Sequence, residues 1–308
     1  MGLYYTKRSK ANAISHIRQL CIFCKAFNQP VLPVSKNCLL GFIELLSRSS
    51  GFGHISHVLN SIEFLHKCKG FDYIGHSFEF NVLLRGLKRK LAKPVKQALP
   101  ITPEMLVLMY PYVNINSPFE LAHWCAFLFG IRLLYRKSSL APESIQKFDA
   151  KTGLSREKTA IVGNSILVYQ NFSKTNQFMA STRVIPLTAS PIQALDPVFH
   201  YSKLMNENPV DKKLPAFSYV YAGHVRCVTH RSFTNFLKLM LRKIGVDPDK
   251  WTGHSFRRGG ASWLYRLGVD PLTIQGVGDW ASDTFLRYLD LNFDRLWSAQ
   301  QAMAFFTI

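Results

Sequence analysis

The segment Pro118–Leu134 constrains the fold more than any other part of the sequence. It is strongly apolar, which predicts a helix that is buried inside a larger domain. No stretch of the chain approaches the roughly 20 uninterrupted apolar residues that span a bilayer. The first residues also lack the apolar run of a secretory signal. We therefore expect an intracellular protein without a membrane partner.

Apolar residues at three- and four-residue intervals predict a mainly α-helical chain with a small β-sheet. The first ~90 residues have the pattern of a compact four-helix unit. Two segments with the composition of strands, Ile166–Tyr169 and Arg183–Leu187, flank a polar turn. Proline residues stiffen the stretch Gln97–Pro103, which we take as the boundary between a domain of residues 1–98 and one of residues 99–308. The expected helices are Ala11–Phe27, Ser35–Arg48, His54–Lys67, Phe78–Leu91, Pro103–Leu108, Pro118–Leu134, Ala194–Asn206, His230–Ile244 and His254–Leu267.

The charge balance indicates a polyanionic partner. The chain has 38 Lys and Arg residues against 19 Asp and Glu residues, a formal net charge of +19, which is far more than solubility requires. Nucleic acid is favoured, because binding a line of phosphates releases counterions. A membrane surface is the weaker alternative, since the chain has no long basic amphipathic helix and no lipidation motif.

A basic run at the end of the fourth predicted helix is a candidate DNA-binding surface. A solvated helix end explains any one of its residues equally well, so the run gains weight only from the overall surplus of positive charge. Its residues are Arg85, Lys88, Arg89, Lys90, Lys93 and Lys96.

The six cysteines are scattered, and we expect free thiols in a reducing compartment. Cys21 and Cys24 form a C-x-x-C motif, but they lie within the apolar periodicity of a predicted helix and no second pair has zinc-finger spacing. Packing in the core is therefore favoured over metal binding. The sequence also lacks a carboxylate cluster for a two-metal site and a G-x-x-x-x-G-K-[ST] phosphate loop, so we expect no metal and no cofactor.

The sharpest local motif is His254-Ser-Phe-Arg257, which opens a predicted helix directly after Gly253. The spacing places both side chains on one helical face. The first turn of a helix also offers free backbone N–H groups and a partial positive charge, which suit a phosphate. Taken alone the motif is weak, because a capping histidine and a surface arginine are its commoner explanation.

The order of the motifs around His254 resembles the tyrosine recombinase (phage integrase) family. Its members carry an arginine in an early buried helix, a lysine in a β-turn, an H-x-x-R motif, a His or Trp, and then a tyrosine. Here Gly278-Asp279-Trp280 follows the H-x-x-R motif, and Tyr288 comes eight residues after Trp280. The resemblance covers the C-terminal half strongly and the N-terminal half less so. It implies a helical, SAM-like core-binding domain followed by an α+β catalytic domain.

The resemblance implies an enzyme that cleaves and rejoins double-stranded DNA through a covalent 3′-phosphotyrosine on Tyr288. Arg136 and Arg257 would hold the phosphate, His254 would accept the phenolic proton, and Lys174 would protonate the leaving 5′-hydroxyl. The phosphotyrosine keeps the bond energy, so rejoining needs neither ATP nor a cofactor. The implied catalytic residues are Tyr288, Arg136, Arg257, His254, Lys174 and Trp280, where Trp280 replaces the commoner His and its indole N–H can donate one hydrogen bond.

Two of these assignments require a choice. Arg136 is preferred to Arg132, because the family arginine precedes an aspartate at the start of the first strand by a characteristic interval, and Asp149 fits that interval from Arg136. Lys174 lies in the polar turn between the two predicted strands, and the alternative is an ordinary turn lysine. One departure from the family is Ser139, which stands where members often have an acidic residue.

Finer features of the resemblance favour recombinases of eukaryotic mobile elements of the DIRS, Ngaro and crypton kinds, which implies a nuclear protein. The basic stretch Leu87–Lys93 fits a nuclear localisation signal or a DNA-contacting face equally well. The apolar segment Asn292–Ile308 is expected to pack on its own domain or on a neighbouring protomer of a homo-oligomer on DNA. Two other functions stay open: a non-catalytic DNA-binding protein descended from a recombinase, and a type IB topoisomerase.

Overall fold

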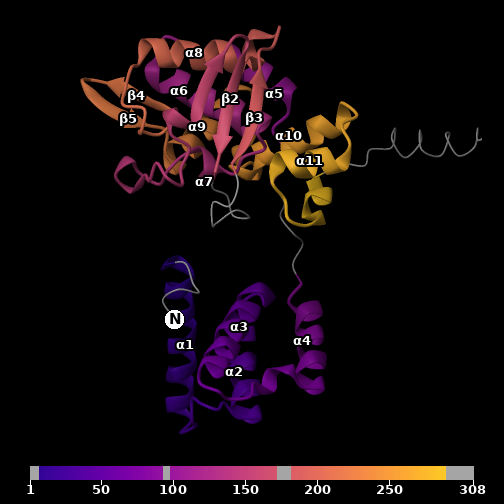
Figure 1. Ribbon diagram of the computed structural model, residues 1–308. Helices are drawn as coiled ribbons and strands as arrows, with labels where there is room; N and C mark the ends of the chain where they lie inside the picture. The colour runs from indigo at the N-terminus through magenta and orange to yellow at the C-terminus, as the bar shows by residue number, and fades with distance from the viewer. Residues whose placement is uncertain (1–6, 93–97, 172–181, 289–308) are drawn as a thin grey trace, which may run out of the picture. The chain divides into compact units, whose positions relative to one another are not determined.

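The computed structural model describes residues 7–92, 98–171 and 182–288. The chain divides into two compact units, Met1–Lys96 and Gln97–Ile308 (Figure 1). The expected fold class is confirmed, because the described part is mostly helical and carries two small antiparallel sheets. No described helix is both long enough and apolar enough to cross a lipid bilayer.

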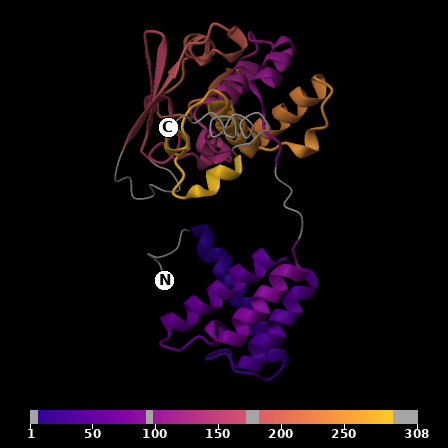
Figure 2. The ribbon, with the colours of Figure 1, turned by 90° about the vertical axis from the view of Figure 1, so that its right-hand side faces the viewer.

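The N-terminal unit contains the four helices that the sequence predicts, packed around one apolar core (Figure 2). Fully buried side chains such as Leu20, Ile55 and Ile62 form its centre. Ser35 caps the second helix, since its side chain accepts a hydrogen bond from the amide of Cys38. The helices are α1 (Lys7–Ala26), α2 (Lys36–Ser49), α3 (Phe52–Cys68) and α4 (Phe78–Lys90).

The C-x-x-C motif contributes to this core. Cys24 is fully buried, and its Sγ lies 3.5 Å from the Sγ of Cys38. Burial and the neighbouring thiol raise the pKa of Cys24 to about 12, so the thiol stays protonated at neutral pH. Within the described ranges, no group of His, Cys, Asp and Glu side chains is arranged to hold a metal ion.

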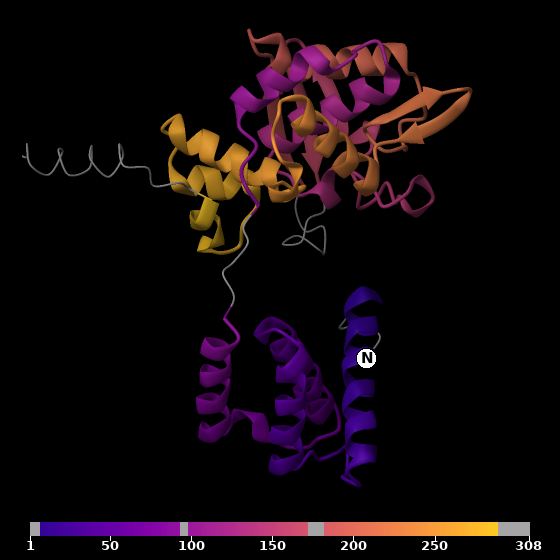
Figure 3. The ribbon, with the colours of Figure 1, turned by 180° about the vertical axis from the view of Figure 1, so that it is seen from behind.

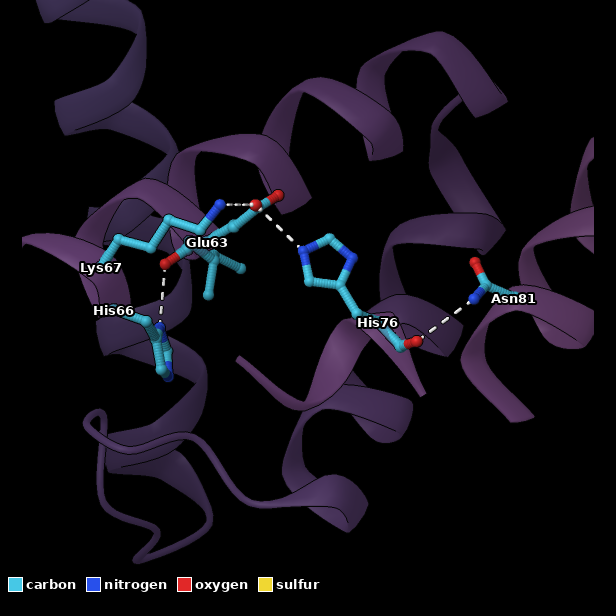
Figure 4. Close-up of polar contacts among 6 residues, drawn as sticks. Glu63, His66, Lys67, His76 and Asn81 are labelled. Carbon is cyan, nitrogen blue, oxygen red and sulfur yellow. Dashed lines mark hydrogen bonds and ion pairs between the residues drawn. The ribbon is translucent and has the colours of Figure 1, made fainter. Parts of the chain in front are cut away.

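A set of polar contacts joins α3 to α4 through the short helix η1 (Ile74–His76) (Figure 4). Glu63 on α3 accepts hydrogen bonds from Lys67 at 2.6 Å and from His76 at 3.0 Å. Asn81 on α4 donates to the carbonyl of His76 at 3.2 Å. The hydrogen bond from Lys67 lowers the pKa of Glu63, which keeps this carboxylate ionised. These contacts hold the start of α4, the helix that carries most of the basic run.

The C-terminal unit is built around the apolar helix identified in the sequence. Every residue of this helix from Leu121 to Ile131 is buried, as predicted. The helix contacts four other helices and one strand. The helices of this unit are α5 (Pro103–Met109), α6 (Pro118–Arg132), α7 (Lys137–Leu140), α8 (Pro197–Glu207), α9 (His230–Lys243), α10 (His254–Arg266) and α11 (Pro271–Gly278).

Two antiparallel sheets complete this unit. The larger has the order β1-β2-β3, with α8 packed against β2 and β3, and it contains both predicted strands. The smaller is a hairpin that projects from the body of the unit (Figure 3), and Ala222 and Gly223 turn it with φ values of 49° and 75°. Three strands were not predicted, because four residues are too few to show an alternating pattern. The strands are β1 (Thr159–Val162), β2 (Ser165–Gln170), β3 (Arg183–Thr188), β4 (Ser218–Tyr221) and β5 (His224–Cys227).

Candidate active site

Helix α10, which carries the H-x-x-R motif, is held very close to its neighbours by two glycines. A Cβ atom added to Gly259 would lie 1.8 Å from the carbonyl oxygen of Ile101, and one added to Gly260 would lie 2.0 Å from that of Ile131. Both contacts are with backbone atoms, so only glycine fits. Because Ile131 belongs to α6, Gly260 brings the backbone of α10 against the C-terminal end of the central helix.

Arg257 is fixed on two sides. The residue is 3% exposed, and its guanidinium donates from Nη1 to the carbonyl oxygen of Leu134, at 2.5 Å. The Trp280 ring lies on the other side, with its centroid 3.8 Å from the Cζ atom of Arg257. A cation against an aromatic face in a buried setting contributes about 2 kcal/mol. The Trp280 ring therefore packs on the arginine.

His254 lies at the start of α10 beside three cations. Its amide bonds to the hydroxyl of Thr252 at 3.2 Å. Partial burial lowers the pKa of His254, and the charges of Arg136, Arg257 and Lys137 lower it further. The imidazole is therefore neutral at physiological pH and able to accept a proton. The start of α7, which carries Arg136, thus lies close to the start of α10, which carries His254 and Arg257.

Lys137 belongs to the same cluster, although the sequence motifs did not indicate it. A Cβ atom on Gly253 would lie 2.7 Å from the Cβ of Lys137, so the lysine stem packs on the start of α10. Its Nζ donates to the hydroxyl of Thr234 at 3.2 Å. The only signal in the sequence was its place directly after Arg136, which does not distinguish it from a surface lysine.

Arg132, the rejected alternative to Arg136, has a different environment. It donates to the carbonyl and hydroxyl oxygens of Thr188 at 2.9 and 3.2 Å, and its Cζ lies 5.8 Å from the Trp263 ring centroid. The interval argument for Arg136 was wrong, however. Asp149 does not begin a strand: it accepts hydrogen bonds from Lys151 and Thr152 in a turn, well before β1. The position of Arg136 beside His254 supports the choice instead.

The segment that ends in Tyr288 packs against the same helices. It forms the short helix η7 (Asp283–Tyr288), which contacts α10 and α11. Phe285 anchors it, since this side chain is buried and its ring centroid lies 5.8 Å from that of Trp280. The backbone of Tyr288 is therefore at the end of an element attached beside the arginine site, while its side chain lies outside the described part.

Residues 153–295 match the model of the Phage integrase family. Solved structures are also similar to this chain in their fold. The XerH site-specific recombinase bound to palindromic difH substrate, in a post-cleavage complex, is similar over 94% of this chain and 76% of its own, with a TM-score of 0.61 and 14% identity. No curated protein sequence matches the chain.

Two further structures have the same fold. A lambda integrase dimer bound to a COC′ core site is similar over 94% of this chain and 90% of its own, with a TM-score of 0.59 and 14% identity. A Tn1549 transposon integrase in complex with a circular intermediate DNA is similar over 97% and 95%, with a TM-score of 0.60 and 12% identity. At this level of identity the similarity establishes the fold alone, which this chain shares with these recombinases and integrases.

The matched phage integrase segment includes most of the candidate catalytic residues, while Arg136 and Lys137 precede it. Lys174 belongs to residues 172–181, which lie outside the described residues, as do Lys93 and Lys96 in residues 93–97 and the apolar C-terminal segment. The expected roles of these parts stay predictions.

The described part of the basic run lies on α4. Arg85, Lys88, Arg89 and Lys90 are all exposed, whereas Leu87 on the same helix is buried. None of the four takes part in an ion pair with another described residue. Their charges are thus available to an external anion.

Proposed function

We propose that this protein cleaves and rejoins DNA strands by the tyrosine recombinase reaction, with Tyr288 as the nucleophile. One observation carries the proposal: the start of α7, with Arg136, packs against the start of α10, which carries His254 and Arg257. The helix η7, which ends in Tyr288, contacts α10. A tyrosine that attacks a phosphodiester needs a base to accept its proton and cations to stabilise the phosphate. A neutral histidine and two arginines beside the tyrosine-bearing segment provide these groups.

In the proposed step the phenolic oxygen of Tyr288 attacks the phosphorus, and the bond from phosphorus to the 5′ oxygen breaks. The products are a 3′-phosphotyrosine and a free 5′-hydroxyl. His254 accepts the proton that leaves the phenol, because its lowered pKa keeps the imidazole neutral. Lys174 supplies the proton that the 5′ oxygen takes up. Attack by a 5′-hydroxyl reverses each transfer and rejoins the strand.

The arginines stabilise the charge that develops on the phosphoryl oxygens. Arg257 needs little reorganisation, because the carbonyl of Leu134 and the ring of Trp280 hold its guanidinium in place. Groups oriented before the reaction stabilise a transition state more than groups that must first reorient. Loss of Arg136 or Arg257 should therefore slow cleavage by orders of magnitude.

The test is to trap the covalent intermediate. Nicked suicide substrates from the sequences that flank its gene are incubated with the protein, and an SDS-resistant protein–DNA adduct is sought. We expect an adduct with the wild type and none with Tyr288→Phe. Arg136→Gln should reduce it strongly, while the exposed Arg242→Gln serves as a charge-matched control in the same unit.

Other outcomes favour the alternative functions. Tight DNA binding without an adduct on any substrate supports a non-catalytic DNA-binding protein. Relaxation of supercoiled DNA without sequence preference supports a type IB topoisomerase.

The basic residues of α4 are proposed to bind DNA phosphates. Replacing Lys88, Arg89 and Lys90 with glutamine should reduce the slope of log affinity against log salt by up to about 2.7, because each phosphate contact contributes about 0.9. Three exposed residues of α1 give a control with equal loss of charge: Lys10, Arg18 and Lys25. If the two triple variants reduce the slope equally, the basic residues of α4 do not form a specific DNA-binding surface.

We also propose that the protein acts as a homo-oligomer on DNA, in the nucleus, within a eukaryotic mobile element. The solved relatives include a lambda integrase dimer on a core site and a lambda integrase tetramer on a Holliday junction. The nuclear and mobile-element proposals depend on the sequence motifs alone. Deleting Asn292–Ile308 tests whether the C-terminal segment links protomers, since unchanged assembly on DNA would exclude that role.

A further inference from the structure

The residue before Trp280 has an uncommon backbone conformation. Asp279 caps the C-terminus of α11 with φ 54° and ψ 54°, in the left-handed region. Glycine occupies this region without strain, and aspartate and asparagine tolerate it better than other residues do. The conformation reverses the chain directly after α11, so it decides where the Trp280 ring lies.

Trp280 depends on this reversal for both of its contacts. Its ring folds back over Gly278, where an added Cβ atom would lie 1.7 Å from the ring. The ring centroid then lies 3.8 Å from the Cζ of Arg257. The backbone at Asp279 therefore controls the position of the ring that packs on Arg257.

Arg183, the first residue of β3, holds this end of α11 at two points. Its guanidinium forms an ion pair with the carboxylate of Asp279, with the nearest N and O atoms 3.6 Å apart, and donates to the carbonyl oxygen of Gly276 at 2.5 Å. A cation at a helix C-terminus also interacts favourably with the helix dipole. The pair is partly shielded, since the side chains of Arg183 and Asp279 are 34% and 22% exposed.

The same pair lies close to the backbone that binds Arg257. Tyr135 is buried next to Leu134, the residue whose carbonyl accepts from Arg257. Burial raises the pKa of Tyr135, and the charges of Arg183 and Asp279 act on it with opposite signs. The charges of the ion pair thus act on the residue directly after the one whose carbonyl binds Arg257.

We propose that Arg183 is a positioning residue for the strand-cleavage reaction. By binding Asp279 and the carbonyl of Gly276, it fixes the end of α11 and so holds the Trp280 ring against Arg257. Arg183 does not touch the reacting atoms in this proposal. The kinetic part of the inference depends on the proposed function, whereas the structural part does not.

The competing explanation is that Arg183 binds a DNA phosphate directly. Two variants separate the explanations. Arg183→Gln removes the cation, and Asp279→Gly removes the carboxylate while it keeps the left-handed conformation free of strain. If Arg183 acts through Asp279, Asp279→Gly has the same kind of defect as Arg183→Gln, though no larger because the bond to Gly276 remains, and the double variant is no worse than Arg183→Gln alone. If Arg183 binds DNA, only Arg183→Gln weakens binding.

The experiment compares these variants in the full chain by single-turnover cleavage of suicide substrates and by DNA binding. We expect cleavage to be about tenfold to a hundredfold slower in both single variants, because small misplacements of catalytic groups have effects of this size. DNA affinity should stay within about threefold, since ground-state binding is retained. Arg183→Lys, which keeps the charge, should recover part of the rate. Arg266→Gln breaks the exposed ion pair with Glu104 at 3.3 Å and is the control.

Hydrogen exchange supplies a readout that does not depend on activity. The amides of Asp279 and Trp280 bond to the carbonyls of Gly276 and Gln275 at 3.1 and 3.2 Å. They should exchange at least about tenfold faster in both variants and at the wild-type rate in the control. If the wild type forms no adduct, the proposed function fails, and exchange alone decides whether Arg183 positions Trp280. Unchanged exchange and cleavage, or a binding defect in Arg183→Gln alone, would overturn the proposal.

Discussion

Replacing Gly260 with alanine should destabilise the C-terminal unit, and the size of the effect follows from the packing of α10. The added Cβ would lie 2.0 Å from the carbonyl oxygen of Ile131 and 2.3 Å from Cδ2 of Leu134. The first contact is with backbone, so one of the two helices must move by about 1 Å or more. Overpacking of this kind costs about 3 kcal/mol.

A loss of about 3 kcal/mol in the free energy of unfolding lowers the urea midpoint by about 1 M or more. The same loss lowers the melting temperature by about 6–12 °C. Tryptophan fluorescence is a selective assay. All five tryptophans lie in the C-terminal unit, so their emission follows its unfolding in the intact chain: Trp124, Trp251, Trp263, Trp280 and Trp297.

Gly276→Ala is the matched control. Gly276 is an exposed residue inside α11, and nothing lies within 4 Å of an added Cβ. Alanine should stabilise this helix by about 0.5–1 kcal/mol, because it reduces the freedom of the unfolded chain. The reasoning is refuted if Gly260→Ala unfolds at the wild-type midpoint, or if both substitutions lower the midpoint equally.

Three further predictions concern buried and charged groups. The acid limb of the cleavage rate should lie below pH 6.5, because the pKa of His254 is lowered from that value; Lys137→Gln removes one positive charge and should move the limb to higher pH in single-turnover assays. His123 is fully buried and its pKa is lowered to about 4. Below pH 6.5 the unfolded chain therefore binds a proton that the folded chain does not, and the free energy of unfolding should fall by about 3 kcal/mol towards pH 4; a urea midpoint as pH-dependent in His123→Gln as in the wild type would contradict this. Arg156 is 2% exposed and donates to the carbonyls of Asn208 and Ser218 at 2.7 and 2.6 Å. Arg156→Met should lower the urea midpoint by an amount that corresponds to about 3 kcal/mol, and an unchanged midpoint would show that these bonds contribute nothing.

The sequence alone was sufficient to predict the helices and strands that show a clear local hydrophobic pattern. The apolar helix α6 and the pair of strands β2 and β3 were predicted because their hydrophobic pattern extends over enough residues to be recognised. The shortest elements, among them β1, the β4–β5 hairpin and α7, were missed, because local propensity is weak over four residues. The spacing of His254 and Arg257 also determines their common helical face, because residues three positions apart lie on the same side of a helix.

Tertiary structure decided which distant groups meet. Arg132 and Arg136 occupy the same short stretch of sequence, yet only the packing of the whole unit shows that Arg132 bonds to Thr188 while Arg136 lies beside His254. The contacts of Trp280 with Arg257, and of Arg183 with Asp279, likewise join residues that are far apart in the chain or belong to different elements. Hydrophobic periodicity in the sequence indicates which side of a helix or strand faces the core. It contains no information about which other element lies there, because that depends on how all the elements pack together.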